Sequence, residues 1–201
     1  MSSLLTLNRF FVSQKAKLIE LTNEYTILDE EGNAAGAIRQ EGQSKARKLL
    51  RAFTSVDQFL THHLSVYDAT GTKILALTRP AKIMKSKVLI ADGAGAPVGS
   101  IEQQNVIGKI RFGFLGSQGE AIGGVNAENW RAWNFSITDA AGTEIGRITK
   151  KWSGIGKEMF TTADNYMVEI DADVTGPLRL LALAAAAGVD TALKQDARGL
   201  G

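Results

Sequence analysis

The sequence predicts a mainly β fold of the α+β class, a closed antiparallel barrel of about twelve strands around a buried apolar helix at the C-terminus. Two observations predict this fold. A turn signature recurs five times along the chain, each time between short β-prone runs. A segment of leucine and alanine then follows near the C-terminus. A barrel of that size is too wide for the wall side chains alone to fill, so a helix inside it is the matching core.

The turn signature is Asp-x-x-Gly. Its four copies begin at Asp29, Asp68, Asp92 and Asp139. The Asp side chain can accept hydrogen bonds from backbone N–H groups two residues on, which starts a turn. The glycine can adopt the left-handed conformation that closes a hairpin. A fifth copy, Gly116 to Gly119, lacks the Asp, and five hairpins supply ten strands.

The residues after each turn also repeat. An apolar residue stands three positions after the turn glycine, and in most copies the next residue is a second glycine. Two positions after that residue stands another apolar one. Residues two apart on a strand share one face, so these apolar positions predict an inner face. Glycines within strands suit the sharp bends of a barrel. Segments 10–20 and 165–170 are expected to add one strand each.

The apolar helix is predicted at about residues 177–194. Pro177 suits a first helical turn, and the stretch from Leu178 to Val189 is apolar on nearly every side except at Arg179. Such a helix belongs in a core or a membrane. A stretch of that length spans roughly 18 Å, well short of a hydrocarbon core of about 30 Å. We therefore expect a buried helix, and we expect Leu181→Asp to unfold the domain.

The length of 201 residues is compatible with one large β domain or two small ones, and we expect one domain over residues 1–201. The chain is 44% hydrophobic and 22% charged, with a net charge of +2 and no cysteine. Without cysteine it has no disulfide framework, thiolate nucleophile or cysteine zinc site. So small a net charge does not imply a nucleic-acid partner. The chain shows neither a signal-peptide pattern nor an apolar stretch of about 18 residues, so we expect a cytoplasmic protein with no transmembrane segment.

No catalytic constellation stands out, so we expect neither enzyme activity nor a cofactor. The two histidines, His62 and His63, are adjacent and would point to opposite faces of a strand. The glycine-rich segment 93–99 lacks the lysine and the following helix of a phosphate-binding loop.

Basic residues gather in three segments, and all of them except Arg79 and Lys157 are candidate residues for binding lipid headgroups. Cations near an anionic leaflet contribute about 1 kcal/mol each. If the segments converge on one face they predict salt-sensitive membrane attraction, and otherwise they are solvated surface. The clusters are Lys45, Arg47, Lys48 and Arg51 on a predicted short helix over residues 43–53, then Arg79, Lys82, Lys85 and Lys87 between two hairpins, then Lys150, Lys151 and Lys157 around Trp152.

Three stretches of the chain resemble scramblase-related proteins of the tubby C-terminal-like superfamily, which includes the phospholipid scramblases and the LURP-one-related proteins. The stretches are residues 10–15, 23–25 and 148–166, and the resemblance covers nearly the whole chain. It implies a barrel around a C-terminal helix. Tubby-type domains bind phosphoinositides, and animal scramblases are linked to calcium-dependent lipid movement. This chain lacks the proline-rich extension and the lipidated cysteine cluster of those proteins.

The resemblance also places a calcium segment at residues 162–173. Asp164 and Asp173 match its acidic positions and are the calcium candidates, but Met167 replaces a glycine that would allow the turn. A calcium loop needs several oxygen ligands and a flexible bend. Residues 165–170 instead alternate as a strand does, so we expect a strand followed by an acidic turn.

Two functions are consistent with these observations. The first is a non-enzymatic, scramblase-related binding module that docks reversibly on anionic phospholipid or phosphoinositide headgroups, as a peripheral membrane protein. The alternative is a soluble protein-interaction or scaffold domain with no lipid role.

Overall fold

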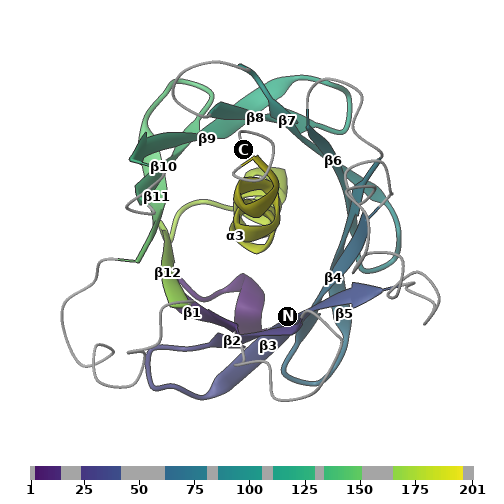
Figure 1. Cartoon of the computed structure of the whole chain (residues 1–201), viewed down its shortest axis with the longest axis vertical. Helices are drawn as coiled ribbons and strands as arrows, with labels where there is room; N and C mark the ends of the chain where they lie inside the picture. The colour runs from purple at the N-terminus through teal and green to yellow at the C-terminus, as the bar shows by residue number, and fades with distance from the viewer. Residues whose placement is uncertain are drawn as a thin grey trace.

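Twelve strands form a closed antiparallel barrel in the computed structural model, which describes residues 3–14, 24–41, 62–80, 86–105, 111–129, 134–150 and 165–196 (Figure 1). Each strand pairs with its neighbours in sequence, and β1 closes the ring against β12. This confirms the predicted fold. The strands are β1 (Arg9–Gln14), β2 (Glu24–Leu28), β3 (Ala34–Glu41), β4 (His62–Asp68), β5 (Lys73–Arg79), β6 (Lys87–Asp92), β7 (Pro97–Gln103), β8 (Arg111–Gly116), β9 (Ala121–Asn129), β10 (Asn134–Asp139), β11 (Glu144–Thr149) and β12 (Asn165–Ile170).

The five predicted hairpin turns share one geometry. In each turn the glycine has a φ between 81° and 88°, the left-handed region. At Asp68, one carboxylate oxygen accepts the N–H groups of Thr70 and Thr72, both at 2.9 Å. Asp29 and Asp92 accept the equivalent pairs of N–H groups, and Asp139 accepts the later one. The repeat in the sequence is therefore a repeat of turn chemistry.

The turn from Gly116 to Gly119 has no Asp at its start, and its carboxylate comes instead from the residue after the turn glycine, Glu120. Glu120 accepts the N–H of Gln118 at 3.1 Å. A side chain built on Gly116 would collide with the Glu120 carboxylate. The Glu120 carboxylate therefore lies where the Asp side chain of the other copies would be.

Each hairpin also contains a β-bulge at the same place. The pairing register shifts by one residue in all five hairpins, and the extra residue is the apolar one three positions after the turn glycine. A bulge bends its strand and increases the local twist. Five equivalent bends around the ring help the sheet to close. The extra residues are Ala35, Ile74, Val98, Ile122 and Ile145.

The helix α3 (Gly176–Asp196) runs inside the barrel (Figure 1). Its residues from Leu181 to Ala187 are all buried, and Leu181 is 0% exposed. The Tyr166 hydroxyl of β12 donates a hydrogen bond of 2.8 Å to the carbonyl of Ala186, which fixes the helix to the wall. The buried core helix is thus confirmed. No helix in the described part of the chain is both long enough and apolar enough for a membrane span.

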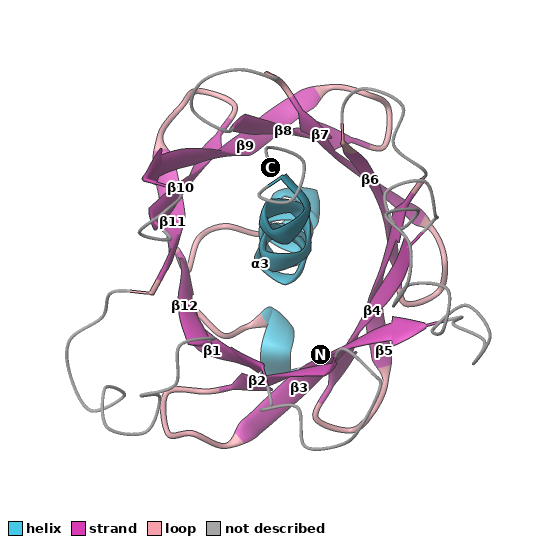
Figure 2. Cartoon of the chain, in the orientation of Figure 1, coloured by secondary structure: helices cyan, strands magenta, loops and turns pink. Residues whose placement is uncertain are grey.

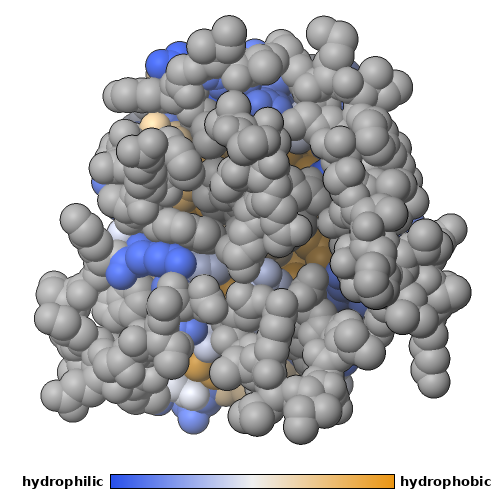
Figure 3. All heavy atoms as spheres, viewed as in Figure 1, coloured by the Kyte–Doolittle hydropathy of each residue, from blue (hydrophilic) through white to orange (hydrophobic). Residues whose placement is uncertain are grey.

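A second, unpredicted element also lies inside the ring. The 3-10 helix η1 (Ser3–Leu5) lies within the barrel outline beside β1 and β3 (Figure 2). Its Leu4 is 2% exposed and belongs to the same hydrophobic core as α3. The space-filling view along the barrel shows apolar residues toward the middle of the ring and hydrophilic residues around it (Figure 3).

The two ends of the barrel differ in their connections. The five hairpin turns and the turn from β12 into α3 lie at one end, which we call the turn rim. The other strand ends meet at the opposite rim. The connections that join them, residues 15–23, 42–61, 81–85, 106–110, 130–133 and 151–164, lie outside the described residues.

Candidate functional site

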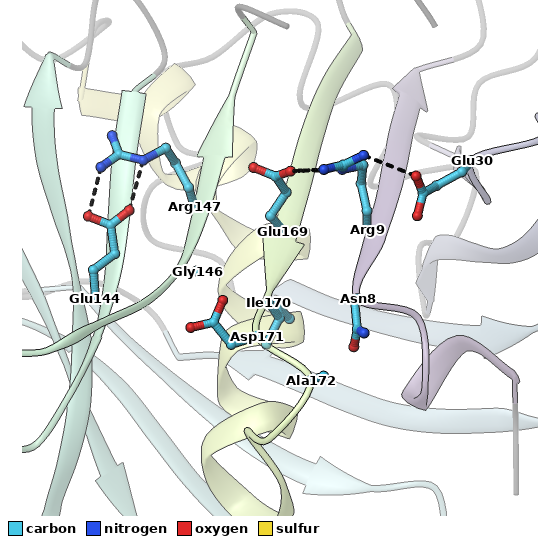
Figure 4. A pocket seen from close by; sticks show the side chains of 10 residues that line it. All are labelled: Asn8, Arg9, Glu30, Glu144, Gly146, Arg147, Glu169, Ile170, Asp171 and Ala172. Carbon is cyan, nitrogen blue, oxygen red and sulfur yellow. Dashed lines mark hydrogen bonds and ion pairs between the residues drawn. The ribbon is translucent and has the colours of Figure 1, made fainter. Parts of the chain in front are cut away.

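A charged groove of about 630 Å³ crosses the outer wall where β11, β12 and β1 run side by side (Figure 4). Its lining comes from these three strands, from the β2–β3 turn, and from the turn that follows β12. The lining residues are Asn8, Arg9, Glu30, Glu144, Gly146, Arg147, Glu169, Ile170, Asp171 and Ala172.

Strand register brings the charges of the groove together. Arg147 of β11 lies opposite Glu169 of β12, which in turn lies opposite Arg9 of β1. Residues directly opposite on neighbouring strands point to the same face, and the strands are about 4.8 Å apart. A row of alternating charge therefore crosses three strands whose residues are far apart in the sequence.

Both arginines of the groove are held by carboxylates. The Arg9 guanidinium contacts Glu169 at 2.7 Å and Glu30 at 3.0 Å, and the hydrogen bond to Glu169 is the main cause that raises the pKa of Arg9. Arg147 donates two hydrogen bonds to Glu144, at 2.9 and 2.7 Å, and one of 2.6 Å to the Asn134 side chain. Exposed ion pairs of this kind contribute about 0–1 kcal/mol each, so they orient side chains more than they stabilise the fold.

The carboxylate left over in the groove is that of Asp171. It is exposed, and within the described residues its side chain makes no hydrogen bond or ion pair. Figure 4 shows it directed into the groove between Glu144 and Glu169. With two arginines against four carboxylates, the lining has a net charge of −2. The groove is therefore suited to a cationic group rather than to a phosphate.

The predicted headgroup residues are only partly described. Lys87 is exposed and forms an ion pair of 2.7 Å with Glu102, and the hydrogen bond from Lys87 lowers the pKa of Glu102. Lys150 is half-buried, and neither of these lysines lines the groove. Lys45, Arg47, Lys48, Arg51, Lys82, Lys85, Lys151 and Lys157 lie outside the described residues.

One expectation about the basic clusters is wrong. Arg79, which we grouped with the surface cations, is only 6% exposed. The burial pattern of β5 explains this, because Leu75, Leu77 and Arg79 alternate on its inward face. Period-two alternation therefore carries this arginine to the inner side of the wall, where it is not available to a membrane surface.

Only one of the two calcium candidates lies among the described residues. Asp173 is exposed in the turn after β12, and Asp164 lies outside the described residues. Residues 165–170 form β12, so the expected strand and acidic turn are confirmed. Among the described residues, no group of three or more His, Asp or Glu side chains could hold a metal ion.

Sequence reasoning missed the role of Arg179. This residue is 9% exposed at the start of α3, and burial lowers the pKa of its guanidinium. It donates hydrogen bonds to main-chain carbonyls of the segment before β1 and of the turn after β12. The signal in the sequence was a single charge in the otherwise apolar stretch from Leu178 to Val189, because a buried charge requires hydrogen-bond or ionic partners.

The chain is similar to known proteins over almost its whole length. The family model described as Scramblase matches residues 1–193. The chain is 26% identical over 178 residues to the Saccharomyces cerevisiae protein named Altered inheritance rate of mitochondria protein 25, across 76% of this chain and 53% of that protein. It is 26% identical over 161 residues to a phospholipid scramblase family protein of Schizosaccharomyces pombe, across 74% of this chain and 41% of that protein.

This chain thus spans about half the length of the curated relatives it matches. No solved structure matches it. The family match confirms the resemblance to scramblase-related proteins that the sequence indicated. The chain belongs to the scramblase family.

Proposed function

We propose that this domain is a non-enzymatic binding module that docks reversibly on anionic phospholipid surfaces, with the opposite rim toward the bilayer. The observation that carries the proposal is a separation of charge between the two ends of the barrel. Net charge alone, at +2, would give only weak attraction. Its distribution along the barrel axis is what matters for docking.

The turn rim is acidic. Its six turns hold ten Asp or Glu residues and a single lysine, Lys73. An anionic leaflet repels this end of the domain, and the repulsion acts within a Debye length of about 8 Å at physiological salt. The six segments are residues 29–33, 68–73, 92–97, 116–121, 139–144 and 171–175.

The connections of the opposite rim are basic in sequence. Together they contain twelve Lys or Arg and four Asp or Glu. These connections lie outside the described residues, but all the strand ends they join lie at that rim. This topology supports the convergence of the basic segments that the sequence alone left open. Each cation near an anionic leaflet contributes about 1 kcal/mol.

The family supplies the class of ligand. One relative carries phospholipid scramblase in its name, and this chain shares its family. Phospholipid headgroups are therefore the first ligands to test. Phosphoinositides, which carry more negative charge per headgroup, are expected to bind more strongly at equal mole fraction.

Co-sedimentation with vesicles tests the proposal. Vesicles of phosphatidylcholine alone are compared with vesicles containing phosphatidylserine, at low and at physiological salt. We expect binding to the anionic vesicles that weakens as salt rises, because salt screens exposed charges. Equal and negligible binding to both vesicles at low salt would contradict the proposal.

The groove favours a second candidate function, a soluble protein-interaction domain with no lipid role. Its net charge of −2 and the Asp171 carboxylate, which pairs with no described residue, suit a lysine or arginine of a partner protein. A partner that binds the wild-type domain but not Asp171→Asn, without any vesicle binding, would favour this function over lipid docking.

A further inference from the structure

The segment from Leu4 to Asn8, which we call the plug, lies inside the barrel at the turn rim, beside β1 and β3. Leu4 is buried in the core, and Leu5 and Leu7 pack against it. Gly36 of β3 lies directly against Leu4, since a Cβ at that position would be 2.9 Å from a Leu4 methyl carbon as well as 2.4 Å from the Tyr67 carbonyl oxygen. The plug therefore packs against the inner wall, and Figure 2 shows its short helix η1 inside the ring.

Arg179 ties the plug to the start of α3. Its guanidinium donates hydrogen bonds of 2.6 Å to the carbonyls of both Leu5 and Leu7, and one of 3.3 Å to the Asn8 side chain. It also donates to the carbonyls of Asp171 and Val174, at 3.1 and 3.2 Å. One side chain thus joins the plug, the β12–α3 turn and the helix.

The buried guanidinium of Arg179 depends on these hydrogen bonds for its stability. Its hydrogen-bond partners are four carbonyls and one amide oxygen, none of them a carboxylate. A cation in the first turn of a helix is also disfavoured by the helix dipole. A buried guanidinium without these acceptors would be strongly destabilised. The plug therefore supplies three of the five acceptors that allow Arg179 to stay buried.

The barrel wall does not depend on the plug in the same way. β1 begins at Arg9, and its pairing with β12 starts at the Arg9–Glu169 position. The main-chain bond of 2.8 Å from Ile170 to the Asn8 carbonyl joins the plug to the wall. Removing Leu4 to Asn8 from its seat therefore breaks no register position of the closed sheet, which is the condition for a local opening.

We propose that the plug is a detachable element and that Arg179 is its latch. When the plug leaves its seat, the end of the barrel at the turn rim opens to the apolar interior, and the guanidinium loses three acceptors at once. The rest of the sheet stays closed. This conformational device is separate from lipid docking at the opposite rim and does not rest on it.

Thiol labelling tests the latch, since the chain has no cysteine of its own. Leu4→Cys places a single buried thiol on the plug, and Val125→Cys places one on the inner wall of β9. The rate of labelling under native conditions reports how often each site opens. Each cysteine variant is combined with Arg179→Met, or with Arg147→Met as a matched control, because Arg147 donates hydrogen bonds to Glu144 and Asn134 on the outer wall.

We expect the thiol at position 4 to label faster than the thiol at position 125 in the parent background. Arg179→Met should accelerate position 4 by at least about tenfold, since a single hydrogen bond to a charged group contributes that much. Arg179→Met should leave the labelling rate at position 125 unchanged. Arg147→Met should leave the labelling rates at both positions unchanged. Unchanged labelling at position 4, equal acceleration at both positions, or failure of Arg179→Met to fold would each overturn the proposal.

Discussion

The interior of the barrel and its outer wall use the same strands in opposite ways. Inside, α3 is apolar and buried from Leu181 to Ala187, and Leu181 has no exposed surface. Outside, Arg9 and Glu169 form an ion pair at 2.7 Å with side chains 47% and 36% exposed. A substitution at a buried interior residue is expected to lower the free energy of unfolding strongly. A substitution of an exposed charge on the outer wall is expected to change it very little, because solvent screens the charge. The charges on the outer wall can therefore be changed, and can serve binding, with little effect on the stability of the fold.

The largest expected effect is that of Leu181→Asp. The carboxylate would enter an apolar core with no partner, at a cost of several kcal/mol, comparable with the total stability of a domain. We expect an unfolded or insoluble protein by circular dichroism and gel filtration. Leu181→Met, which nearly conserves volume, is the control and should stay folded. A folded Leu181→Asp protein would show that α3 is not the core of the barrel.

Tyr166→Phe sharpens the comparison from the inside. The change removes only the hydroxyl that donates to the Ala186 carbonyl. We expect a loss of about 1–2 kcal/mol in the free energy of unfolding, measured with denaturant. Tyr67→Phe is the control, because the Tyr67 hydroxyl bonds to Glu41 on the half-buried wall. An equal or greater loss for Tyr67→Phe would remove the distinction between interior and wall.

The ionised carboxylate of Glu41, on the wall, is expected to contribute less to stability as the pH falls. Hydrogen bonds from Tyr67 and Lys73 lower the pKa of this carboxyl in the folded protein below its ordinary value of 4.5. A lowered folded pKa adds stability that is present above pH 4.5 and is lost as the pH falls through the folded value. Since Glu41 is 37% exposed, the contribution is expected to be a few tenths of a kcal/mol.

Denaturant unfolding of the wild type and Glu41→Gln at pH 7 and pH 3 measures this contribution. The difference in stability between the two proteins should shrink at pH 3. A difference that stays constant with pH would mean that ionisation of Glu41 does not stabilise the wall.

The smallest expected effect is the coupling of Arg9 to Glu169. A double-mutant cycle with Arg9→Gln and Glu169→Gln should give a coupling energy of about 0.2–1 kcal/mol that decreases with salt. A salt-independent coupling above about 2 kcal/mol would show that the groove is part of the stabilising structure.

The fold could be predicted from local chemistry, whereas the sites could not. Asp68 and Gly71 specify their turn by themselves, so repetition revealed the hairpins and hence the barrel. Arg179 and Leu5 are 174 positions apart, and no local sequence pattern predicts their contact. The groove likewise depends on register between β1, β11 and β12, which closure of the ring brings together.

The basic segments show the same division. Sequence identified Lys45, Lys48 and Lys82 as candidate binding cations, but only the strand order shows that their connections join one rim. Arg79 was misplaced because its charge was taken to put it on the surface, although it stands two positions after Leu77, on the face that the apolar pattern marks as inner.

Vesicle binding by two charge-matched variants tests most directly whether the two rims act differently. Lys45→Gln/Lys48→Gln removes two cations from a connection of the opposite rim, and Arg9→Gln/Lys73→Gln removes two from the turn-rim half of the wall. We expect the first variant to bind phosphatidylserine vesicles more weakly by roughly tenfold or more, and the second to match the wild type within about twofold. Equal loss in both, or a greater loss in the second, would contradict docking through the opposite rim.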